Sequence, residues 1–386
     1  MDALPRKPGS VLCIVGARPN YMKMAPLLRA FAAEPAMPPA VLVHTGQHYD
    51  PALNDRLFAD LELPAPDVNL GVGSGSHAVQ TAEVMKRIEP VIDQTAPSCV
   101  VVVGDVNSTI AVGLVAVKKD IPVVHVEAGL RSYDRAMPEE INRILTDAIS
   151  SLLYTTERSA HANLAKEGIV GDHVRFVGNL MIDSLHAALP KAVAPAEALR
   201  AEGADPALVA GAFGIVTLHR PSNVDTPEAL SEVLDIVRAA SERLPLVWPI
   251  HPRTRANLDR FGLRAQLDGA RIALVGPQGY LQMVGLMRAA RLVLTDSGGV
   301  QEETTALGVP CLTLRDNTER PITVEQGTNT LVRRDRAQVL ALVDEIMASG
   351  GKRGRAPELW DGRTASRIAA DLAQWLAQRA TTQVRP

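Results

Sequence analysis

The chain has 386 residues, more than a single hydrophobic core usually serves, so two domains are expected. Acidic and basic residues are interspersed, the formal net charge is −3, and aromatic residues make up 3%, which argues against a nucleic-acid partner. No apolar run approaches the ~18 residues of a membrane span, and the start lacks the long apolar core of a secretory signal. We therefore expect a cytoplasmic protein with no membrane partner.

Apolar runs of strand length alternate with helical stretches in the first half of the chain. These runs begin at Val11, Ala40, Cys99, Pro122, Leu152 and Val174. The alternation is typical of a doubly wound parallel sheet, and it predicts a Rossmann-like N-terminal domain over residues 1–187.

The segment Ala188–Gly211 is rich in alanine and proline and interrupts this alternation, so we place the connection between the domains at its start. Strand-like runs resume at Phe213, Leu244, Arg271, Arg291, Pro310 and Asn329. They predict a second Rossmann-like α/β domain over residues 188–363, with the two sheets facing a cleft. The helical periodicity of residues 364–386 predicts a last helix, which could pack back on the N-terminal domain.

Carboxylates stand where strands end and helices begin. Asp105 follows the run VVVVG, Glu127 ends PVVHVE, and Glu139 and Glu140 begin a helix behind Pro138. Ligands of open parallel sheets bind beyond the carboxyl ends of the strands, so these acids are aimed at one cleft. The pattern predicts acid/base chemistry.

Each of these acids also has a purely structural interpretation. Asp105 suits a helix N-cap, and Glu139 suits an exposed i,i+4 ion pair with Arg143. Glu127 fits such an interpretation less well, because an acid that ends a buried strand needs an ion-pair or hydrogen-bond partner, or a role in the function. His125 shares a strand face with Glu127, and we expect a hydrogen-bonded core histidine there.

A second signal is the run Asp296-Ser297-Gly298-Gly299, which joins a buried strand to a helix. Two glycines at a helix start let a diphosphate approach backbone N–H groups, and the Ser297 hydroxyl adds a donor. Glu303, further along this helix, could accept hydrogen bonds from a ribose. The alternative is a tight turn in which Ser297 and Asp296 only cap the helix.

Basic and polar residues follow other strand ends. Arg18 and Lys23 stand near the start of the helix after the first strand, where the helix dipole disfavours a cation, so they indicate an anionic ligand. Solvated surface charge is the alternative. His219, Gln278 and Arg320 also follow strands, either near the cleft or as plain loop residues.

Two local patterns yield further predictions. Asp225 with Glu228 resembles a capping box for the helix that follows. The glycine-rich stretch Gly71–Gly75 follows no buried strand, so it predicts a loop near the cleft and not a nucleotide fingerprint.

Ten motifs in unbroken order carry a resemblance to a known family. They are GARPNYMKMAP, TGQHYD, VVGDVNST, HVEAGLRS, MPEEINR, TLHR, PIHP, GPQGYL, TDSGGVQEE and DNTERP. From about Val11 to Val332 the chain resembles the non-hydrolysing UDP-N-acetylglucosamine 2-epimerase family. The resemblance implies a two-domain fold like that of the B-type glycosyltransferases, with UDP in the C-terminal domain and the sugar in the cleft. It also implies a homodimer that needs no cofactor and no metal.

The resemblance implies roles for single residues. Catalytic positions fall on Arg18, Lys23, Asp105, Glu127, Glu139, Arg143 and His219. UDP-binding positions fall on Gln278, Ser297, Gly298, Gly299, Glu303 and Arg320. A regulatory region of the family is matched at Gln47, His48 and His251. However, Pro221 and Ser222 replace an arginine and a glutamate of many bacterial members, so activation by substrate is not expected.

In the chemistry that the resemblance implies, removal of the C2 proton is coupled to departure of UDP from C1, which leaves a 2-acetamidoglucal. Return of a proton on the opposite face and of UDP to C1 inverts C2. Two faces require more than one acid/base group, and Asp105, Glu127 and Glu139 are the candidates, with no assignment to a face. The departing diphosphate would be stabilised by Arg18, His219 and Arg320, together with the start of the helix at Ser297–Gly298.

Alternative functions stay open at this stage. The motifs GARPN, TGQHYD and VNST lean towards relatives that act on modified sugars such as UDP-2,3-diacetamido-glucuronic acid. A hydrolysing 2-epimerase would release free N-acetylmannosamine and UDP, and a glycosyltransferase would need an acceptor. A catalytically inactive regulator that binds sugar nucleotides is a further alternative, and the retention of Asp105, Glu127, Glu139 and His219 argues against it.

Overall fold

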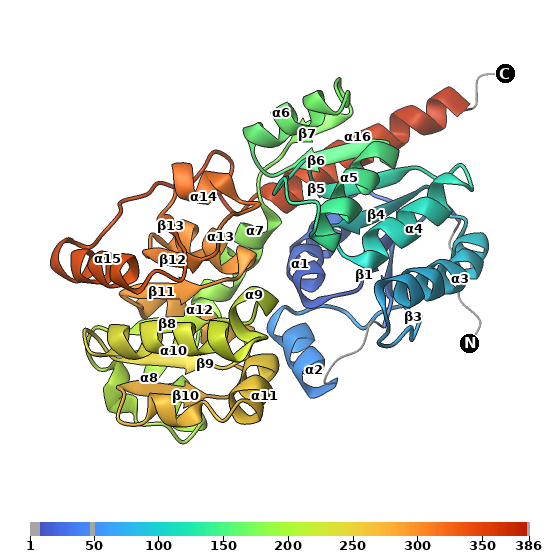
Figure 1. The fold of residues 1–386 in the computed structure, drawn as a ribbon. Coiled ribbons are helices and arrows are strands. Elements are labelled where there is room, and N and C mark those ends of the chain that lie inside the picture. Colours follow the sequence, from blue (N-terminus) through green and yellow to red (C-terminus); the bar gives the residue numbers. More distant parts are fainter. Residues whose placement is uncertain (1–7, 47–50, 384–386) are drawn as a thin grey trace. The chain divides into compact units, whose positions relative to one another are not determined.

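The computed structural model describes residues 8–46 and 51–383. The chain forms two compact units, one made of Met1–Ser184 with Glu358–Pro386 and the other of Leu185–Pro357. Each unit is a parallel sheet covered by helices on both faces (Figure 1), which confirms the predicted class of two doubly wound α/β units. In the described ranges, no helix is both long and apolar enough to cross a membrane.

The first unit contains, within the described residues, a seven-stranded sheet in the order β3-β2-β1-β4-β5-β6-β7. Its strands are β1 (Val11–Val15), β2 (Ala40–His44), β3 (Val68–Asn69), β4 (Cys99–Val103), β5 (Val123–Ala128), β6 (Leu152–Thr155) and β7 (Val174–Phe176). The apolar runs of the sequence form these strands because both faces of the sheet are buried. The strand order reverses between β1 and β4, which is where sheets of this kind bind ligands.

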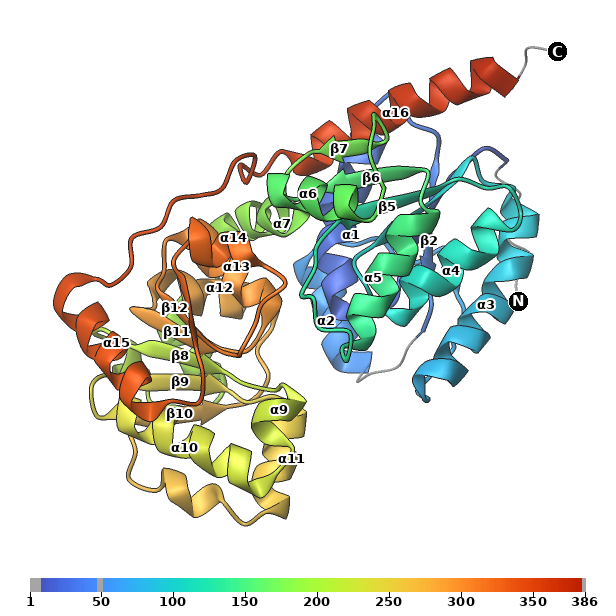
Figure 2. The ribbon, with the colours of Figure 1, turned by 45° about the horizontal axis from the view of Figure 1, so that its top comes forward.

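Helices cover both faces of this sheet. They are α1 (Arg18–Ala33), α2 (Pro51–Asp60), α3 (His77–Thr95), α4 (Asn107–Val117), α5 (Pro138–Ile149), α6 (Arg158–Lys166), α7 (Leu180–Ala188) and α16 (Thr364–Gln383). Helices α3, α4 and α5 lie side by side on one face, and α1 and α16 pack together on the other (Figure 2). Asp183 of α7 accepts hydrogen bonds from the first two N–H groups of α16, at 3.1 and 2.7 Å. The last helix therefore belongs to the first unit.

The second unit contains, within the described residues, a six-stranded sheet in the order β10-β9-β8-β11-β12-β13. Its strands are β8 (Gly214–Thr217), β9 (Leu246–Pro249), β10 (Ile272–Val275), β11 (Leu292–Thr295), β12 (Cys311–Leu314) and β13 (Asn329–Val332). The order reverses between β8 and β11, so the loops after these two strands form the expected ligand end.

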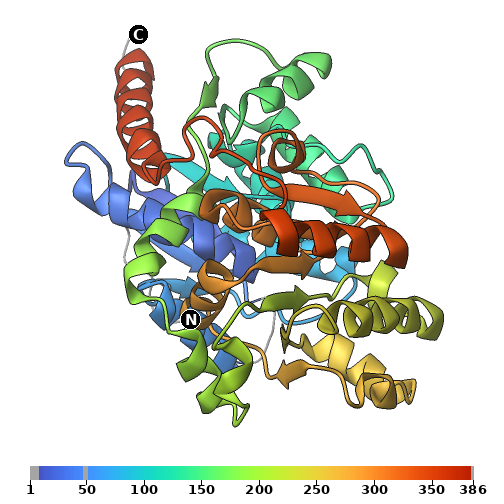
Figure 3. The same cartoon turned by 90° about the vertical axis from the view of Figure 1, so that its left-hand side faces the viewer.

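The helices of the second unit follow the same alternation. They are α8 (Pro195–Ala201), α9 (Pro221–Val224), α10 (Pro227–Ser241), α11 (Pro252–Arg260), α12 (Tyr280–Ala289), α13 (Gly298–Leu307), α14 (Pro321–Glu325) and α15 (Arg336–Ser349), with short 3-10 turns at Leu189–Lys191, Pro206–Val209 and Arg264–Leu267. Helices α10 and α15 pack together over the sheet (Figure 3). Leu234, Leu294 and Val343 are buried in the core between them and the strands.

Of two local predictions, the capping box is wrong and the glycine-rich loop is confirmed. The capping box is replaced by Thr226, whose side chain accepts from the Ala229 N–H, because Asp225 is paired with Arg253 of α11. The glycine-rich stretch Gly71–Gly75 forms a loop, as predicted, although the edge strand β3, with Val68 buried and Asn69 exposed, ends two residues earlier. That strand has only two residues, which is too short to show an alternating pattern.

Candidate active site

Glu127 lies near the carboxyl end of β5 in a backbone conformation that residues with a side chain rarely adopt. Its φ is 72°, and the pairing of β5 with β6 shifts register between Val126 and Ala128. A left-handed backbone at a non-glycine residue costs ~1–3 kcal/mol, and such residues are enriched at functional sites. The residue is 6% exposed and forms an ion pair with Lys23 of α1. A buried, paired carboxylate therefore stands at the ligand-binding edge of the sheet.

The start of α1 is fastened to the end of β4 by Asn20. Its Oδ1 accepts from two N–H groups of the preceding loop at 3.1 and 3.0 Å, and its Nδ2 donates to the Val103 carbonyl at 2.9 Å. Lys23 is buried, so the alternative of solvated surface charge is wrong for this residue. Burial lowers the pKa of Arg18, and no carboxylate in the described part of the chain pairs with it.

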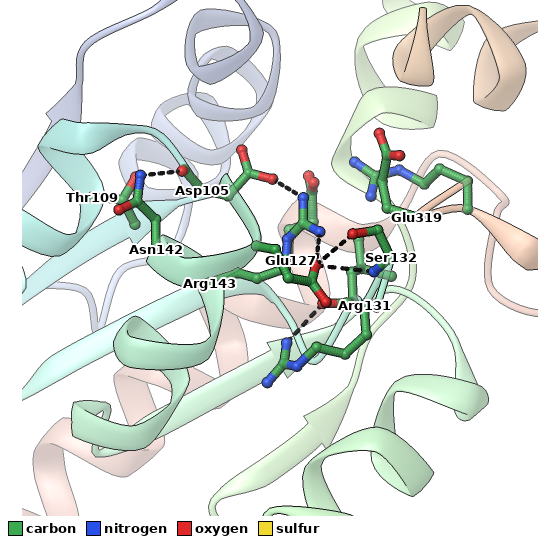
Figure 4. A network of polar contacts seen from close by, with 12 residues as sticks. Asp105, Thr109, Glu127, Arg131, Ser132, Asn142, Arg143 and Glu319 are labelled. Atoms are coloured by element: carbon green, nitrogen blue, oxygen red, sulfur yellow. Dashed lines mark hydrogen bonds and ion pairs between the residues drawn. The ribbon is translucent and has the colours of Figure 1, made fainter. Parts of the chain in front are cut away.

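Arg143 of α5 joins two acids at the same edge. Its side chain forms ion pairs with Asp105, after β4, and with Glu140, one turn earlier in α5. Figure 4 shows the first of these pairs. The predicted i,i+4 pair of Arg143 with Glu139 is therefore wrong. Asp105 as a helix N-cap is also wrong, because α4 begins at Asn107 without a side-chain cap.

Glu140 is held by the loop that precedes α5. It is 1% exposed and accepts hydrogen bonds from the Ser132 N–H and hydroxyl, both at 2.9 Å, and from the Tyr133 N–H at 2.8 Å. Burial alone raises the pKa of Glu140, but these bonds and the Arg143 charge bring it below its usual value. Glu139 is half-buried, and no hydrogen bond or ion pair occupies its carboxylate within the described residues.

Four of the predicted catalytic residues thus come together in the first unit. Lys23 contacts Glu127, Arg143 contacts Asp105, and the two pairs stand at the ends of adjacent strands. Lys23 also lies close to the turn that carries Asp105. A Cβ added to Gly104, the residue before Asp105, would lie 3.3 Å from Lys23 Nζ. Two carboxylates and two cations therefore line one short stretch of the sheet edge.

The second unit places His219 against a buried carboxylate. His219 Nδ1 lies 3.0 Å from Asp296 Oδ1, and Asp296 also accepts from the His219 and Arg220 N–H groups and from Asn223 Nδ2. Burial alone raises the pKa of Asp296, but the bonds from His219, Asn223 and Arg220 lower it below its usual value. An ionised Asp296 therefore orients the His219 ring, and Asp296 is more than a second helix cap.

The start of α13 carries the features expected of an anion site. Ser297 is the N-cap residue by position, but its side chain makes no capping hydrogen bond, so the capping alternative is wrong for the hydroxyl. A Cβ on Gly298 would lie 2.6 Å from Glu319 Oε1, so a larger residue there would require the Glu319 side chain to move. Gly299 follows in the first turn of the same helix. N–H groups of this turn have no partner inside the helix.

Glu303, further along α13, and Gln278, just before α12, are engaged within the protein. Glu303 is buried and accepts from the Tyr280 hydroxyl at 2.8 Å, and burial raises the pKa of Glu303 to about 8. Gln278 is buried and donates to the Gly276 carbonyl at 3.0 Å. Glu303 therefore carries a proton at neutral pH and is able to donate a hydrogen bond as well as to accept one.

Arg320 belongs to a cluster of arginines and glutamates at the same end of the unit. Its Nε lies 2.8 Å from Glu302 Oε1, and both residues are buried. Beside them, Glu319 Oε2 lies 2.8 Å from Arg315 Nη2, and Glu319 Oε1 lies 3.7 Å from Arg220 Nη2. Burial alone raises the pKa of Glu319, but the neighbouring guanidinium charges bring it far below its usual value. The cluster contains more arginines than glutamates, which favours an anionic ligand.

The predicted regulatory region is described only in part. Gln47 and His48 lie outside the described residues. His251 is the N-cap of α11, accepts from the Arg253 N–H at 3.2 Å, and lies with its ring centroid 5.2 Å from that of His219.

Comparison with known proteins identifies the family. A family model described as UDP-N-acetylglucosamine 2-epimerase matches residues 32–373. The chain belongs to the UDP-N-acetylglucosamine 2-epimerase family. Among its relatives in this family, the UDP-N-acetylglucosamine 2-epimerase of Methanocaldococcus jannaschii is 41% identical over 93% of this chain and 97% of the relative.

Two further relatives bear on substrate and fold. The UDP-2,3-diacetamido-2,3-dideoxy-D-glucuronate 2-epimerase of Pseudomonas aeruginosa is 37% identical over 94% of this chain and 99% of that protein. The crystal structure of the M. jannaschii enzyme in complex with UDP-GlcNAc and UDP superposes with a TM-score of 0.83, at 39% identity, over 95% of this chain and 99% of that one. The 2-epimerase fold is thus shared over nearly the whole chain.

Several buried residues of this 2-epimerase were not predicted from the sequence as parts of the site. They are Asp147, Arg131, Asp296 and Glu319. The spacing of Glu140, Arg143 and Asp147 places all three on one face of a helix, and it is the signal that would have found Asp147. The core histidine predicted at His125 is confirmed, since it is 0% exposed and bonded to Asp147.

Proposed function

We propose that this protein interconverts UDP-N-acetylglucosamine and UDP-N-acetylmannosamine by a non-hydrolysing 2-epimerisation. The observation that carries the proposal is Glu127, a buried carboxylate on a strained backbone beside Lys23 at the ligand-binding edge of a parallel sheet. Membership of the 2-epimerase family and the likeness to the M. jannaschii complex support the substrate class.

The chemistry explains why acids are needed on both faces of the sugar. The C2 hydrogen stands next to no carbonyl, so a base removes it as a proton while the C1–O bond to UDP breaks. The products are UDP and a 2-acetamidoglucal, held in the site. An acid on the other face then gives a proton to C2 while a diphosphate oxygen re-forms the bond to C1. Only C2 is inverted, and one protein carboxyl group has gained the proton that another has lost.

We assign the acid/base work to Asp105, Glu127 and Glu139, without dividing them between the two faces. Lys23 forms an ion pair with Glu127, and Arg143 forms one with Asp105, so both carboxylates are held in place. Arg18, whose guanidinium has no carboxylate partner in the described ranges, would contact the diphosphate.

In the second unit, the proposed role of His219 and the first turn of α13 is to stabilise negative charge on the departing UDP. Asp296 orients the histidine for this. The proposed UDP-binding residues are Gln278, Ser297, Gly298, Gly299, Glu303 and Arg320.

Proton NMR of the protein with UDP-N-acetylglucosamine in heavy water tests the proposal. Deuterium at C2, in a mixture of both UDP-sugar epimers, is the expected result. Free N-acetylmannosamine with stoichiometric UDP would favour the hydrolysing reaction instead. Absence of exchange with every UDP-2-acetamido sugar, while UDP still binds, would leave the inactive binding protein as the better account.

A modified sugar is a second candidate substrate, favoured by the 37% identity to the P. aeruginosa enzyme. The same NMR assay with UDP-2,3-diacetamido-2,3-dideoxy-D-glucuronate decides between the two through the ratio of their kcat/KM values.

Assembly, location and regulation complete the proposal. We propose a cytoplasmic homodimer that binds no nucleic acid, and light scattering of the purified protein would measure its mass. We also propose that substrate activation is absent, because Pro221 and Ser222 stand in the regulatory region. A hyperbolic rate curve, with normal rates from UDP-N-acetylmannosamine alone, is then expected.

A further inference from the structure

A buried polar network lies next to the ends of β4 and β5. His125 Nδ1 lies 2.6 Å from Asp147 Oδ1, and His125 Nε2 lies 2.9 Å from the Gly104 carbonyl oxygen. Asp147 Oδ2 accepts from the Gly129 N–H at 3.0 Å and lies 2.7 Å from Arg131 Nη2. The side chains of His125 and Asp147 are 0% exposed, so water does not compete for these bonds.

This network connects the two turns that carry the proposed acid/base groups. The residue that precedes Asp105 accepts from His125, and the residue two positions after Glu127 donates to Asp147. Asp147 therefore reaches the first turn through His125 and the second turn directly. The bond from the Gly129 N–H to Asp147 comes just after Glu127, whose backbone is strained. It holds the end of β5 in place, and strain of this kind persists only where the surrounding structure holds it.

The charge of Asp147 suits this role. Burial alone raises the pKa of Asp147, but His125 and Arg131 bring it below its usual value. A carbonyl oxygen only accepts, so His125 Nε2 donates to the Gly104 carbonyl. An amide at position 147 would remove the negative charge that pairs with Arg131 and one of the two acceptor atoms.

We propose that Asp147 is a positioning residue that fixes Asp105 and Glu127 at the separation needed for the two proton transfers. The inference rests on the proposed function, because the separation of these acids matters only if they react. Glu140 and Arg143 lie on the same helical face as Asp147, so three residues of α5 tie the ends of β4 and β5 to one rigid element.

The first test compares Asp147→Asn with the wild-type protein. We expect kcat, counted per UDP-binding site, to fall by about 100-fold, because a displacement on the order of 1 Å has that effect on a reacting pair. KM and the Kd for UDP should stay within about threefold, since the nucleotide is assigned to the second unit. Counting active sites by UDP titration separates slow catalysis from loss of folded protein.

The matched control is Asp371→Asn. Asp371 of α16 also accepts a hydrogen bond within the first unit, from the Tyr154 hydroxyl at 2.8 Å, but it contacts neither acid-bearing turn. Its kcat should equal that of the wild type. An equal loss of kcat in both variants, or a kcat of Asp147→Asn within threefold of wild type, would overturn the proposal.

His125→Asn provides a second variant in case Asp147→Asn does not fold. Asparagine is too short to span from the carboxylate to the Gly104 carbonyl, so only the Asp105 branch is cut. We expect about a tenfold loss of kcat at unchanged UDP affinity. No loss of kcat in a folded His125→Asn protein would contradict the connection.

Crystal structures of the variants give a readout that does not depend on activity. In whichever variant folds, we expect the Asp105 or Glu127 carboxylate to be displaced from its wild-type position relative to α5. Unchanged carboxylates would overturn the positioning role even if the protein proves to have another activity. Displaced carboxylates in a protein that lacks C2 exchange would instead support the positioning and refute the proposed function.

Discussion

The buried and half-buried carboxylates near the strand ends are held by different partners. Glu127 pairs with a lysine, Asp105 with an arginine, and Asp296 with a histidine and backbone N–H groups. Glu303 accepts a hydrogen bond from a neutral tyrosine hydroxyl, so burial dominates and its pKa rises to about 8. Asp296 is thus kept ionised, whereas Glu303 is kept protonated.

Substitution of Glu127 tests the central chemical claim. Glu127→Gln keeps the shape of the side chain but removes its basicity, so turnover should fall by at least about 1,000-fold, within the range of a lost acid/base group. UDP should still bind with nearly unchanged affinity in a calorimetric titration. Near-normal turnover would exclude Glu127 as a base.

The protonated state of Glu303 predicts a pH-dependent stability. Its pKa rises from 4.5, the ordinary value of a glutamate in water, to about 8 in the folded protein, so the folded state keeps a proton that the unfolded state releases. The contribution of this group is fully present below pH about 4.5 and is lost as the pH rises through about 8.

Glu303→Gln removes this dependence, because the amide resembles the protonated acid and does not titrate. From pH about 5 to about 9, the Tm of the wild type should therefore fall relative to that of Glu303→Gln. Thermal melts of both proteins across this range measure the difference between their Tm values. In this difference, the contributions of the titratable groups that both proteins share cancel. A constant difference would show that Glu303 does not bind the proton.

At the scale of elements, the bounds of the strands were predictable from the sequence. Which side chains pair with one another was much less predictable. The bounds of β1, β2 and β4 follow directly from VLCIV, AVLVH and CVVVV, because both-face burial requires an unbroken apolar run. The choice of Glu140 over Glu139 as the partner of Arg143 was not predictable, since both spacings fit a helix. It depends on the path of the loop through Ser132 and Tyr133, whose N–H groups bind Glu140.

The first turn of α13 supplies a prediction at this scale. In Gly298→Ala the new Cβ would lie 2.6 Å from Glu319 Oε1, and Glu319 is held in place by Arg315. We expect the helix start to shift and the Kd for UDP to rise on the order of tenfold, or ~1.4 kcal/mol. Gly211→Ala is the control, because a Cβ there meets nothing within 4 Å. Equal UDP affinity in both variants would contradict an anion site at this helix start.

At the scale of the whole molecule, the last helix, α16, belongs to the first unit. The periodicity of the sequence predicted this helix but did not indicate which residues bind it to that unit. Asp183 binds its first N–H groups, and the Tyr154 hydroxyl donates to Asp371 in its second turn. These contacts join residues more than 180 positions apart in the sequence. Such long-range pairings leave no local pattern, which is why the docking of α16 needed the structure.

Trp360, just before this helix, predicts how strongly the returning segment stabilises the first unit. It is 3% exposed, and its Nε1 donates to the Thr156 carbonyl at 3.1 Å. Trp360→Ala should lower the free energy of unfolding of this unit by ~3–5 kcal/mol, since a large cavity and an unpaired carbonyl result. Trp375→Ala, on α16 but half-buried beneath Arg379, should have a clearly smaller effect. Scanning calorimetry measures the stability of both variants. Similar losses of unfolding free energy would mean that apolar contacts along the whole segment, rather than the contact of Trp360 beside β6, keep the last helix in place.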